Sequence, residues 1–525
     1  MQGLNPDLTK KNEENTVIKN PAFRVDMPDV DIIRRGDTFY MISTTMYFMP
    51  GAPILRSKDL KNWEIVSYVF DRISDGDGHT LRNGQNAYGK AQWATSLTYH
   101  NGCYYACFVC HDLGKTFIYH SDDIESSFWE RYEFDRVFHD MSFLFWEDRS
   151  YLIYGNGEIG IVELTDDLSA VKEGGRDELL FSTPKEGIGL RCEGARALVR
   201  NGFLYLFFIE WPTDGNARRR EVCYRAGGPE GPFERKVILD DDMGYRNRGI
   251  AQGCLIDDEA GNWYGVFFQD HDAVGRIPFV MKVRWENDWP MIGEGGRVPK
   301  EFSVPLPEIK TAPLVTGDSL SHMENVIPPQ FQWNHNPDPE AWSFTGRPGY
   351  LRLGPLGLSK DILDARNTLT VRTVTPYSSF TVEGDFSALP EGGYAGICAL
   401  IETWGTLGIR KDKEGFSLVL SHYDGTKKEL EASKIPGFNP ASFFIKIEFN
   451  FANESGEGED LARFFYSADK LHFTEIGSPL KLRFTLKLFT GCRLGIFAYS
   501  TNETGGMAEF RNLVFGEEPD GKTDS

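Results

Sequence analysis

The chain has 525 residues, a length that predicts more than one folded core. Its formal net charge of −21 repels phosphate backbones and anionic membranes, so we expect no nucleic-acid partner. We also expect no membrane insertion, because no apolar run has the length that a spanning helix needs.

The first 19 residues are polar, and we expect them to form a disordered tail. They contain no apolar stretch of the kind found in signal peptides. Two locations fit this start of the chain. We expect a periplasmic protein whose export signal is absent from this chain, with a cytoplasmic protein as the alternative.

A strand–turn–strand pattern then recurs five times. In each unit two short apolar runs flank a polar or glycine-containing turn, as Asn101-Gly102 and Asn201-Gly202 do, which is typical of β-hairpins. Repetition of β-units at this spacing is typical of a β-propeller with one blade per unit. We therefore predict a five-bladed β-propeller over residues 20–305. The five units span residues 32–42, 97–106, 143–154, 197–206 and 254–267.

A second β-domain is expected after the repeats. Residues 306–325 lack periodicity and predict a linker. Beyond them, many short apolar runs without internal repetition favour a β-sandwich over residues 326–518, followed by a frayed tail at 519–525. The predicted fold class is therefore all-β, a five-bladed propeller followed by a C-terminal sandwich.

Three acidic residues stand beside predicted strands in different repeats. They are Asp29, Asp140 and Glu193. One such residue alone is usually a solvated turn residue. Together they supply what glycosidic-bond hydrolysis needs: one carboxylate to activate water and one carboxylic acid to protonate the leaving oxygen. A third carboxyl group nearby can keep the acid protonated by like-charge repulsion.

Several segments, in their order along the chain, resemble glycoside hydrolase family 43, in its arabinofuranosidase and xylosidase branch with an appended sandwich. They include Pro28-Asp29, His139-Asp140, Glu193-Gly194 and Gly275-Arg276. The resemblance covers residues 20–516 and implies a five-bladed propeller and an inverting mechanism. It implies that Asp29 is the general base, Glu193 the general acid, and Asp140 the residue that orients the acid and tunes its pKa. Asp31 is the second candidate for the base.

The same resemblance and the chemistry of sugars suggest substrate-binding residues. Arg276 would bind hydroxyl groups or hold a carboxylate, and a surface ion pair is the alternative. Trp93 and Phe143 would offer aromatic faces to the sugar, although packing in the propeller core is as common a role. Phe48 would shape the rim of the pocket, and Gln252 is a weaker candidate.

We expect neither a metal nor another cofactor. Where many relatives carry a histidine near the centre of the propeller, this chain has Gly249-Ile250-Ala251-Gln252, and isoleucine cannot ligate a metal. The chain has eight cysteines; Cys107 and Cys110 are a C-x-x-C pair but lie in a predicted strand, which favours buried thiols.

The expected activity is that of an exo-acting α-L-arabinofuranosidase. It would release terminal non-reducing arabinofuranosyl residues from plant cell-wall side chains such as those of xyloglucan or arabinoxylan. Residues 44–51 and 269–276 resemble the branch that holds such enzymes. A β-xylosidase acting on xylo-oligosaccharides is the close alternative, and a non-catalytic carbohydrate-binding propeller is the alternative from another class. The partner in each case is a plant polysaccharide or oligosaccharide.

Overall fold

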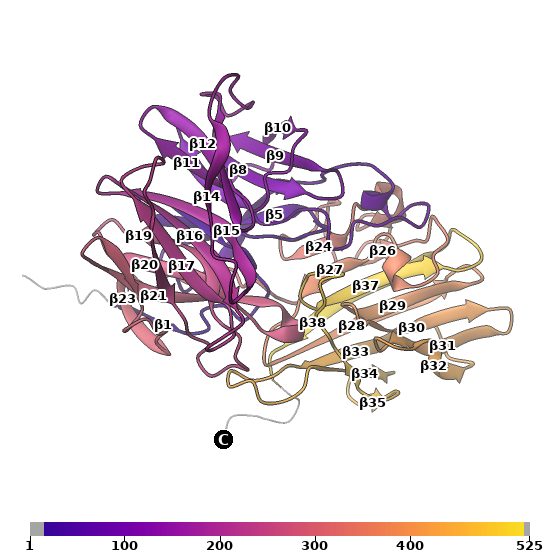
Figure 1. The fold of residues 1–525 in the computed structure, drawn as a ribbon. Helices are drawn as coiled ribbons and strands as arrows, with labels where there is room; N and C mark the ends of the chain where they lie inside the picture. The colour runs from indigo at the N-terminus through magenta and orange to yellow at the C-terminus, as the bar shows by residue number, and fades with distance from the viewer. Residues whose placement is uncertain (1–14, 519–525) are drawn as a thin grey trace, which may run out of the picture.

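The computed structural model describes residues 15–518, which are almost entirely β-structure (Figure 1). Five four-stranded antiparallel sheets follow one another along the chain and form one body. The later strands, orange to yellow in Figure 1, form a second body beside it. The predicted fold class, a five-bladed propeller followed by a sandwich, is confirmed.

Each blade is built from four strands that are consecutive along the chain, apart from the short β4. The inner strands β2, β7, β11, β15 and β19 contact one another in a closed ring, so they surround the propeller axis. The blades are β2 (Asp31–Arg35), β3 (Thr38–Ile42), β5 (Gly51–Ser57) and β6 (Glu64–Phe70); β7 (Ser96–His100), β8 (Cys103–Cys110), β9 (Lys115–Ser121) and β10 (Glu130–Phe134); β11 (Ser142–Trp146), β12 (Arg149–Tyr154), β13 (Glu158–Leu164) and β14 (Asp177–Ser182); β15 (Ile188–Arg200), β16 (Phe203–Pro212), β17 (Arg220–Ala226) and β18 (Glu234–Leu239); and β19 (Ala251–Asp257), β20 (Trp263–Asp270), β21 (Arg276–Glu286) and β22 (Trp289–Ile292).

Local sequence explains these hairpins. Asn101-Gly102 and Asn201-Gly202 join the first two strands of their blades, and all four residues have positive φ, as a type I′ turn requires. In β6, Ile65, Ser67 and Val69 are buried while Val66 and Tyr68 between them are less so, the period-two burial of a strand with one face on the core. Turn chemistry and alternation thus act together to specify each blade.

Residues 15–19 correct the expected boundary of the N-terminal tail. They form strand β1 (Asn15–Lys19), which pairs with β23 (Glu301–Pro307). Val17 and the buried Ile18 pair with Ser303 and Phe302, so these residues are part of the propeller body. The rest of the predicted tail, residues 1–14, and the predicted C-terminal tail, 519–525, lie outside the described residues.

The sandwich consists of two large antiparallel sheets. In spatial order, the first sheet is β32 (Lys428–Pro436), β31 (Gly415–Tyr423), β30 (Gly405–Asp412), β29 (Gly393–Leu400), β37 (Arg493–Ser500), β27 (Leu369–Arg372), β24 (Phe331–Asn334) and β4 (Phe48–Met49). The second is β25 (Trp342–Ser343), β26 (Leu351–Leu353), β38 (Met507–Gly516), β28 (Tyr377–Ala388), β33 (Phe443–Asn450), β34 (Leu461–Ser467) and β35 (Thr474–Glu475), with β36 (Leu480–Lys481) also on β34. The four short 3₁₀ helices of the described chain are η1 (Gly78–Thr80), η2 (Asp272–Val274), η3 (Pro339–Ala341) and η4 (Ile362–Asp364).

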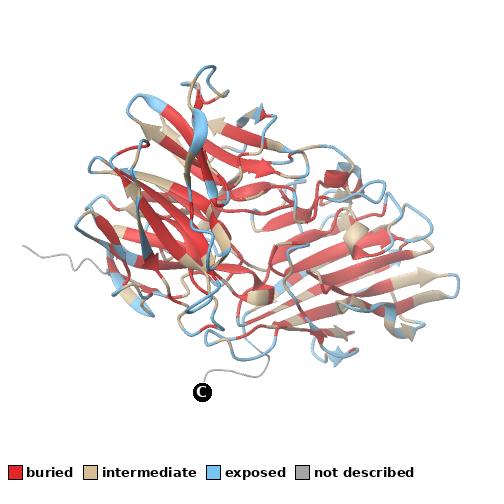
Figure 2. Ribbon diagram, in the orientation of Figure 1, coloured by how far each residue is buried: buried red, intermediate tan, exposed pale blue. Residues whose placement is uncertain are grey.

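The two bodies share structure. Strand β4 comes from the first blade but pairs with β24 of the sandwich, Met49 opposite Trp333. One buried apolar cluster runs from propeller residues such as Phe279 to sandwich residues such as Leu494, and Figure 2 shows burial continuing along the strands of both bodies. The sandwich is therefore in a position to contribute to a site on the propeller.

Two further observations concern the whole described chain. All eight cysteines are free, and seven of them are buried, including Cys107 and Cys110. Among residues 15–518, no helix is long and apolar enough to span a bilayer.

Candidate active site

Asp29, Asp140 and Glu193 line one pocket near the propeller axis, hereafter the central pocket. Asp29 and Asp140 lie just before the inner strands β2 and β11, and Glu193 lies on β15. The ring of inner strands thus brings together residues that are up to 164 positions apart in the sequence. The pocket is lined by Asp29, Met46, Trp93, Ala94, Asp140, Leu190, Glu193, Ile209, Arg219, Gln252, Phe268, Arg276 and Phe489.

Asp29 is paired with Arg276. Its Oδ1 accepts a hydrogen bond from Arg276 Nη1 at 2.8 Å, and both side chains are only 5% exposed. The backbone of Arg276 is fixed in turn, because its N–H donates to Asp26 Oδ1 at 2.7 Å. Gly275 allows this approach: it has φ +109°, and a Cβ there would lie 2.3 Å from the Asp26 carboxylate. The Asp29 carboxylate is therefore oriented through one oxygen, and its other oxygen has no hydrogen-bond partner among residues 15–518.

Glu193 is aimed into the pocket by an irregular strand. The pairing of β15 with β16 shifts register on both sides of Glu193, and such bulges redirect a side chain. Gly194 follows with φ +68°, and its N–H donates to Asp140 Oδ2 at 3.1 Å. Glu193 Oε2 accepts from Asn156 Nδ2 at 2.5 Å. Glu193 and Asp140 are thus held as neighbours by one backbone turn.

His139, which was not among the predicted site residues, lies between these two carboxyl groups. Its Nε2 is 3.2 Å from Glu193 Oε2 and 3.7 Å from Asp140 Oδ2. Burial lowers the pKa of the His139 imidazole, but the charge of Asp140 and the hydrogen bond to Glu193 outweigh burial and raise the pKa to about 9. Burial raises the pKa of the Asp140 carboxyl to about 7, opposed by His139 and assisted by the charge of Glu193. The pocket therefore holds a proton-sharing cluster whose net charge changes near neutral pH.

These shifts predict that the folded state loses stability as pH rises. An imidazole whose pKa increases from about 6.5 to about 9 on folding adds stability that is complete below pH 6.5 and lost by pH 9. Between pH 6.5 and 9 we expect the free energy of unfolding to decrease in the wild type more than in His139→Gln, with a difference of about 1–3 kcal/mol. Urea unfolding of both proteins between pH 6 and 9 measures the difference, and parallel pH profiles would contradict the prediction.

The walls of the pocket come from both bodies of the protein. The Trp93 ring lies 5.3 Å from the ring of Phe489, and the Arg276 guanidinium lies 4.7 Å from the same ring. Phe489 belongs to the loop before β37 of the sandwich and has φ +61°, rare for a bulky residue. Gly491 N in this loop donates to Asp26 Oδ2 at 3.0 Å. Asp26 therefore fixes both Arg276 and the sandwich loop.

Not every predicted sugar-binding residue reaches the central pocket. Trp93, Gln252 and Arg276 line it, but Phe48 and Phe143 do not. Phe48 is fully buried on β4, where the Arg493 guanidinium lies 4.4 Å from its ring. Phe143 is 5% exposed and packs among residues of adjacent blades such as Tyr105. The structure thus corrects the expected positions of these two rings, because both pack in cores.

Asp31, the second candidate for the base, points away from the pocket. Its Oδ2 accepts hydrogen bonds from Ser96 Oγ and Leu97 N, both at 2.9 Å, which tie the first two blades together. Its Oδ1 accepts from Ile32 N at 3.0 Å, and Arg196 Nε lies 3.6 Å from its Oδ2. These contacts give Asp31 a place in the scaffold.

Arg196 lies beneath the pocket and joins three inner segments. Its guanidinium donates to the carbonyl oxygens of Asp29 at 2.9 Å, Thr95 at 2.8 Å and Ala195 at 2.8 Å. The side chain is 3% exposed. Because Asp29 has a positive φ of 54°, which a non-glycine residue seldom adopts, the bond to its carbonyl holds an unusual backbone conformation.

His139, Asp140 and Glu193 are also the one group in the described part of the chain whose donor atoms, all within 4.8 Å of one another, could hold a metal ion. Within this group, Glu193 Oε2 is hydrogen-bonded to His139 Nε2 and to Asn156 Nδ2. Ile250 is fully buried, and its side chain offers no ligand atom.

Three known proteins show what this chain is similar to. One is a solved structure of a bifunctional GH43-CE protein of Bacteroides eggerthii, which superposes on this chain with a TM-score of 0.90 at 36% sequence identity. The superposition covers 96% of this chain and 64% of the longer Bacteroides eggerthii chain. A β-xylosidase of Formosa agariphila is 26% identical over 93% of this chain and 88% of its own length. A non-reducing end α-L-arabinofuranosidase of Bacteroides ovatus is 22% identical over 78% of this chain and 77% of its own.

Two family models cover most of the chain. Residues 322–515 match the β-xylosidase C-terminal concanavalin A-like domain, in agreement with the sandwich. Residues 18–290, a range that contains Asp29, Asp140 and Glu193, match the glycosyl hydrolases family 43 model. The chain therefore belongs to glycosyl hydrolase family 43.

Proposed function

We propose that this glycoside hydrolase is exo-acting and inverting, and that it releases a terminal pentose from plant cell-wall oligosaccharides or polysaccharides. The observation that carries the proposal is the meeting of Asp29, Asp140 and Glu193, from three different blades, in one small pocket. Hydrolysis with inversion needs a base and an acid on opposite sides of one sugar ring. The central pocket offers candidates for both.

In this mechanism Asp29 activates water. Arg276 occupies one of its oxygens and balances its charge, which leaves the other oxygen free to accept a proton from water. Glu193 protonates the leaving oxygen while water attacks the anomeric carbon from the Asp29 side. Asp140, next to Glu193 through the Gly194 amide, and His139 position the acid and supply the charges around it. Trp93 and Phe489 offer apolar faces to the sugar ring.

Two terminal sugars are candidates. The sequence resemblance favoured an α-L-arabinofuranosyl residue, and the name of the Bacteroides ovatus relative supports this sugar. The name of the Formosa agariphila relative supports a β-D-xylosyl residue equally. The two pentoses have the same composition, so the choice depends on the positions of hydroxyl groups in the pocket.

The test is hydrolysis of aryl α-L-arabinofuranosides and aryl β-D-xylosides, followed by product analysis on arabinoxylan, arabinan and xyloglucan oligosaccharides. We expect release of single pentose units, and NMR at early times should show inversion of the anomeric configuration. Turnover of the xyloside alone would exclude the arabinofuranosidase. Sugar binding without hydrolysis of any of these substrates would instead favour a carbohydrate-binding propeller.

A further inference from the structure

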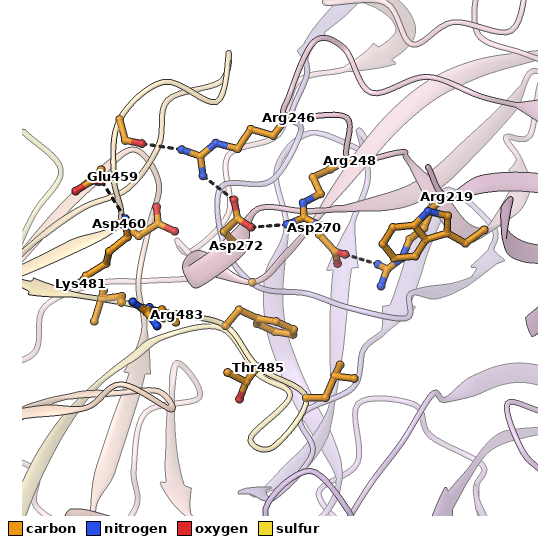
Figure 3. A pocket seen from close by; sticks show the side chains of 16 residues that line it. Arg219, Arg246, Arg248, Asp270, Asp272, Glu459, Asp460, Lys481, Arg483 and Thr485 are labelled. Carbon is orange, nitrogen blue, oxygen red and sulfur yellow. Dashed lines mark hydrogen bonds and ion pairs between the residues drawn. The ribbon is translucent and has the colours of Figure 1, made fainter. Parts of the chain in front are cut away.

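A second cavity, of about 730 Å³, lies between the propeller and the sandwich (Figure 3). This interdomain cavity shares Arg219 with the central pocket. It also continues along two segments of the central pocket, because Gly275 precedes Arg276 and the lining residues 484–486 precede Phe489. A substrate that enters the central pocket can therefore extend into this second cavity.

Strand β16 forms a continuous wall from the central pocket to the interdomain cavity. Ile209 lines the central pocket, and Trp211, two residues on, lines the interdomain cavity. Residues two apart in a strand point to the same face, so the two side chains follow one another along one wall. The Trp211 ring is partly exposed, with the Arg219 guanidinium 5.4 Å from its centre. An aromatic face in this place suits the C–H face of a second sugar.

The cavity is rich in charge, and most of it is paired. Arg219 bonds to Asp270 at 2.5 Å, and Arg246 and Arg248 both bond to Asp272, as the dashed lines in Figure 3 show. The remaining charged residues of the wall are Glu459, Asp460, Lys481 and Arg483. The wall thus carries five basic and four acidic side chains on a protein whose net charge is −21.

Arg483 is the exception to this pairing. Lys481 bonds to Glu459 at 2.9 Å, and the Asp460 carboxylate accepts from the backbone N–H groups of Ala273 and Ala452, each at 3.0 Å. The Arg483 guanidinium has no hydrogen-bond or ion-pair partner among residues 15–518; only its backbone N–H is bonded, to Thr403. An exposed, unpaired guanidinium on a cavity wall is available for an anion.

We propose that the interdomain cavity binds the leaving-group part of the substrate and that Arg483 recognises a carboxylate on it. The ligand would be an oligosaccharide that carries a uronic acid near the residue from which the terminal pentose is released. This proposal rests on the proposed function, because it adds a substrate class to the same reaction. A guanidinium matches a carboxylate with two parallel hydrogen bonds, whereas a neutral sugar gains little from an unpaired charge. The local cation also offsets the repulsion that a protein of charge −21 exerts on an anionic sugar.

The experiment compares two oligosaccharides of equal length with the same terminal pentose, one neutral and one bearing a uronic acid branch. We expect Arg483→Met to lower kcat/KM by about fivefold on the acidic substrate and by less than about twofold on the neutral one, the usual scale of an exposed ion pair. The effect should shrink at high salt, because exposed charges are screened. Lys487→Met is the matched control: Lys487 lies on the same loop and is exposed, but it pairs with Glu402 and does not line the cavity. Lys487→Met should leave kcat/KM unchanged on both the acidic and the neutral substrate.

Binding separates this proposal from the proposed function. Calorimetry on Glu193→Gln, with and without Arg483→Met, measures the affinity for both oligosaccharides independently of turnover. If the acidic oligosaccharide binds more tightly than the neutral one, and Arg483→Met removes this difference in affinity, the proposal is supported. This holds even if the wild type hydrolyses neither oligosaccharide; in that case only the proposed reaction is wrong. The proposal would be overturned if both oligosaccharides bound with equal affinity, or if Arg483→Met weakened the binding of both by the same factor.

Discussion

Replacing Glu193 by glutamine is expected to lower kcat on oligosaccharides by at least about 10², because the leaving oxygen then departs without a proton. Glutamine has the same size and keeps a carbonyl oxygen that can accept the hydrogen bond from Asn156 Nδ2. We therefore expect an intact fold, with an unchanged circular dichroism spectrum and a thermal unfolding midpoint within a few degrees of the wild type. Steady-state kinetics on neutral oligosaccharides of the preferred pentose measure the loss.

The leaving group distinguishes an acid from a residue that only supports the pocket. A 2,4-dinitrophenyl group departs as a stable anion and needs little protonation, so Glu193→Gln should retain most of its activity on the dinitrophenyl glycoside. Asp29→Asn is the comparison, since loss of the base removes water activation whatever the leaving group. It should reduce turnover of both substrates by a similarly large factor. An equal loss for Glu193→Gln on both substrates would contradict its role as the acid.

The repeating part of the fold could be predicted because its signals are local. A turn such as Asn201-Gly202 is specified by two adjacent residues, and the alternating burial of a strand such as β6 is specified by residues two apart. The three carboxyl residues could be found for the same reason, since each stands beside a strand in a motif of a few residues. Once a closed ring is assumed, the inner strands must bring such residues to one axis.

The remainder of the site depends on contacts between distant segments. Phe489 is a single aromatic residue in a loop of the sandwich, and nothing near it in the sequence indicates that it faces Trp93. Asp26 likewise shows its role only through bonds to Arg276 and Gly491, which are 250 and 465 positions away. The sequence predicts Phe48 at the rim of the pocket because it lies in a loop after a strand. The pairing of β4 with β24 buries it in the sandwich instead.

Arg196 gives the second large prediction, a loss of stability rather than of chemistry. It is the one guanidinium in the described chain that bonds to carbonyl oxygens just before β2, just before β7 and within β15. Methionine has a similar length but no donor, so Arg196→Met would leave these buried oxygens unpaired and Asp31 without its cation. We expect the free energy of unfolding to fall by about 3–5 kcal/mol, the usual cost of removing one partner from a buried charged network.

We expect Arg196→Met to lower the activity as well as the stability, for a separate reason. The Arg196 bond to the Asp29 carbonyl holds the left-handed backbone from which the Asp29 carboxylate enters the central pocket. Well below the unfolding temperature, where Arg196→Met is fully folded, kcat should still be reduced on both oligosaccharide and dinitrophenyl substrates, the pattern expected of Asp29→Asn and not of Glu193→Gln. Arg200→Met is the matched control, since Arg200 lies four residues further along β15, is 23% exposed and has its guanidinium 4.1 Å from the centre of the Trp285 ring. If Arg196→Met were as stable and as active as Arg200→Met, the inner strands would hold the base without the central guanidinium.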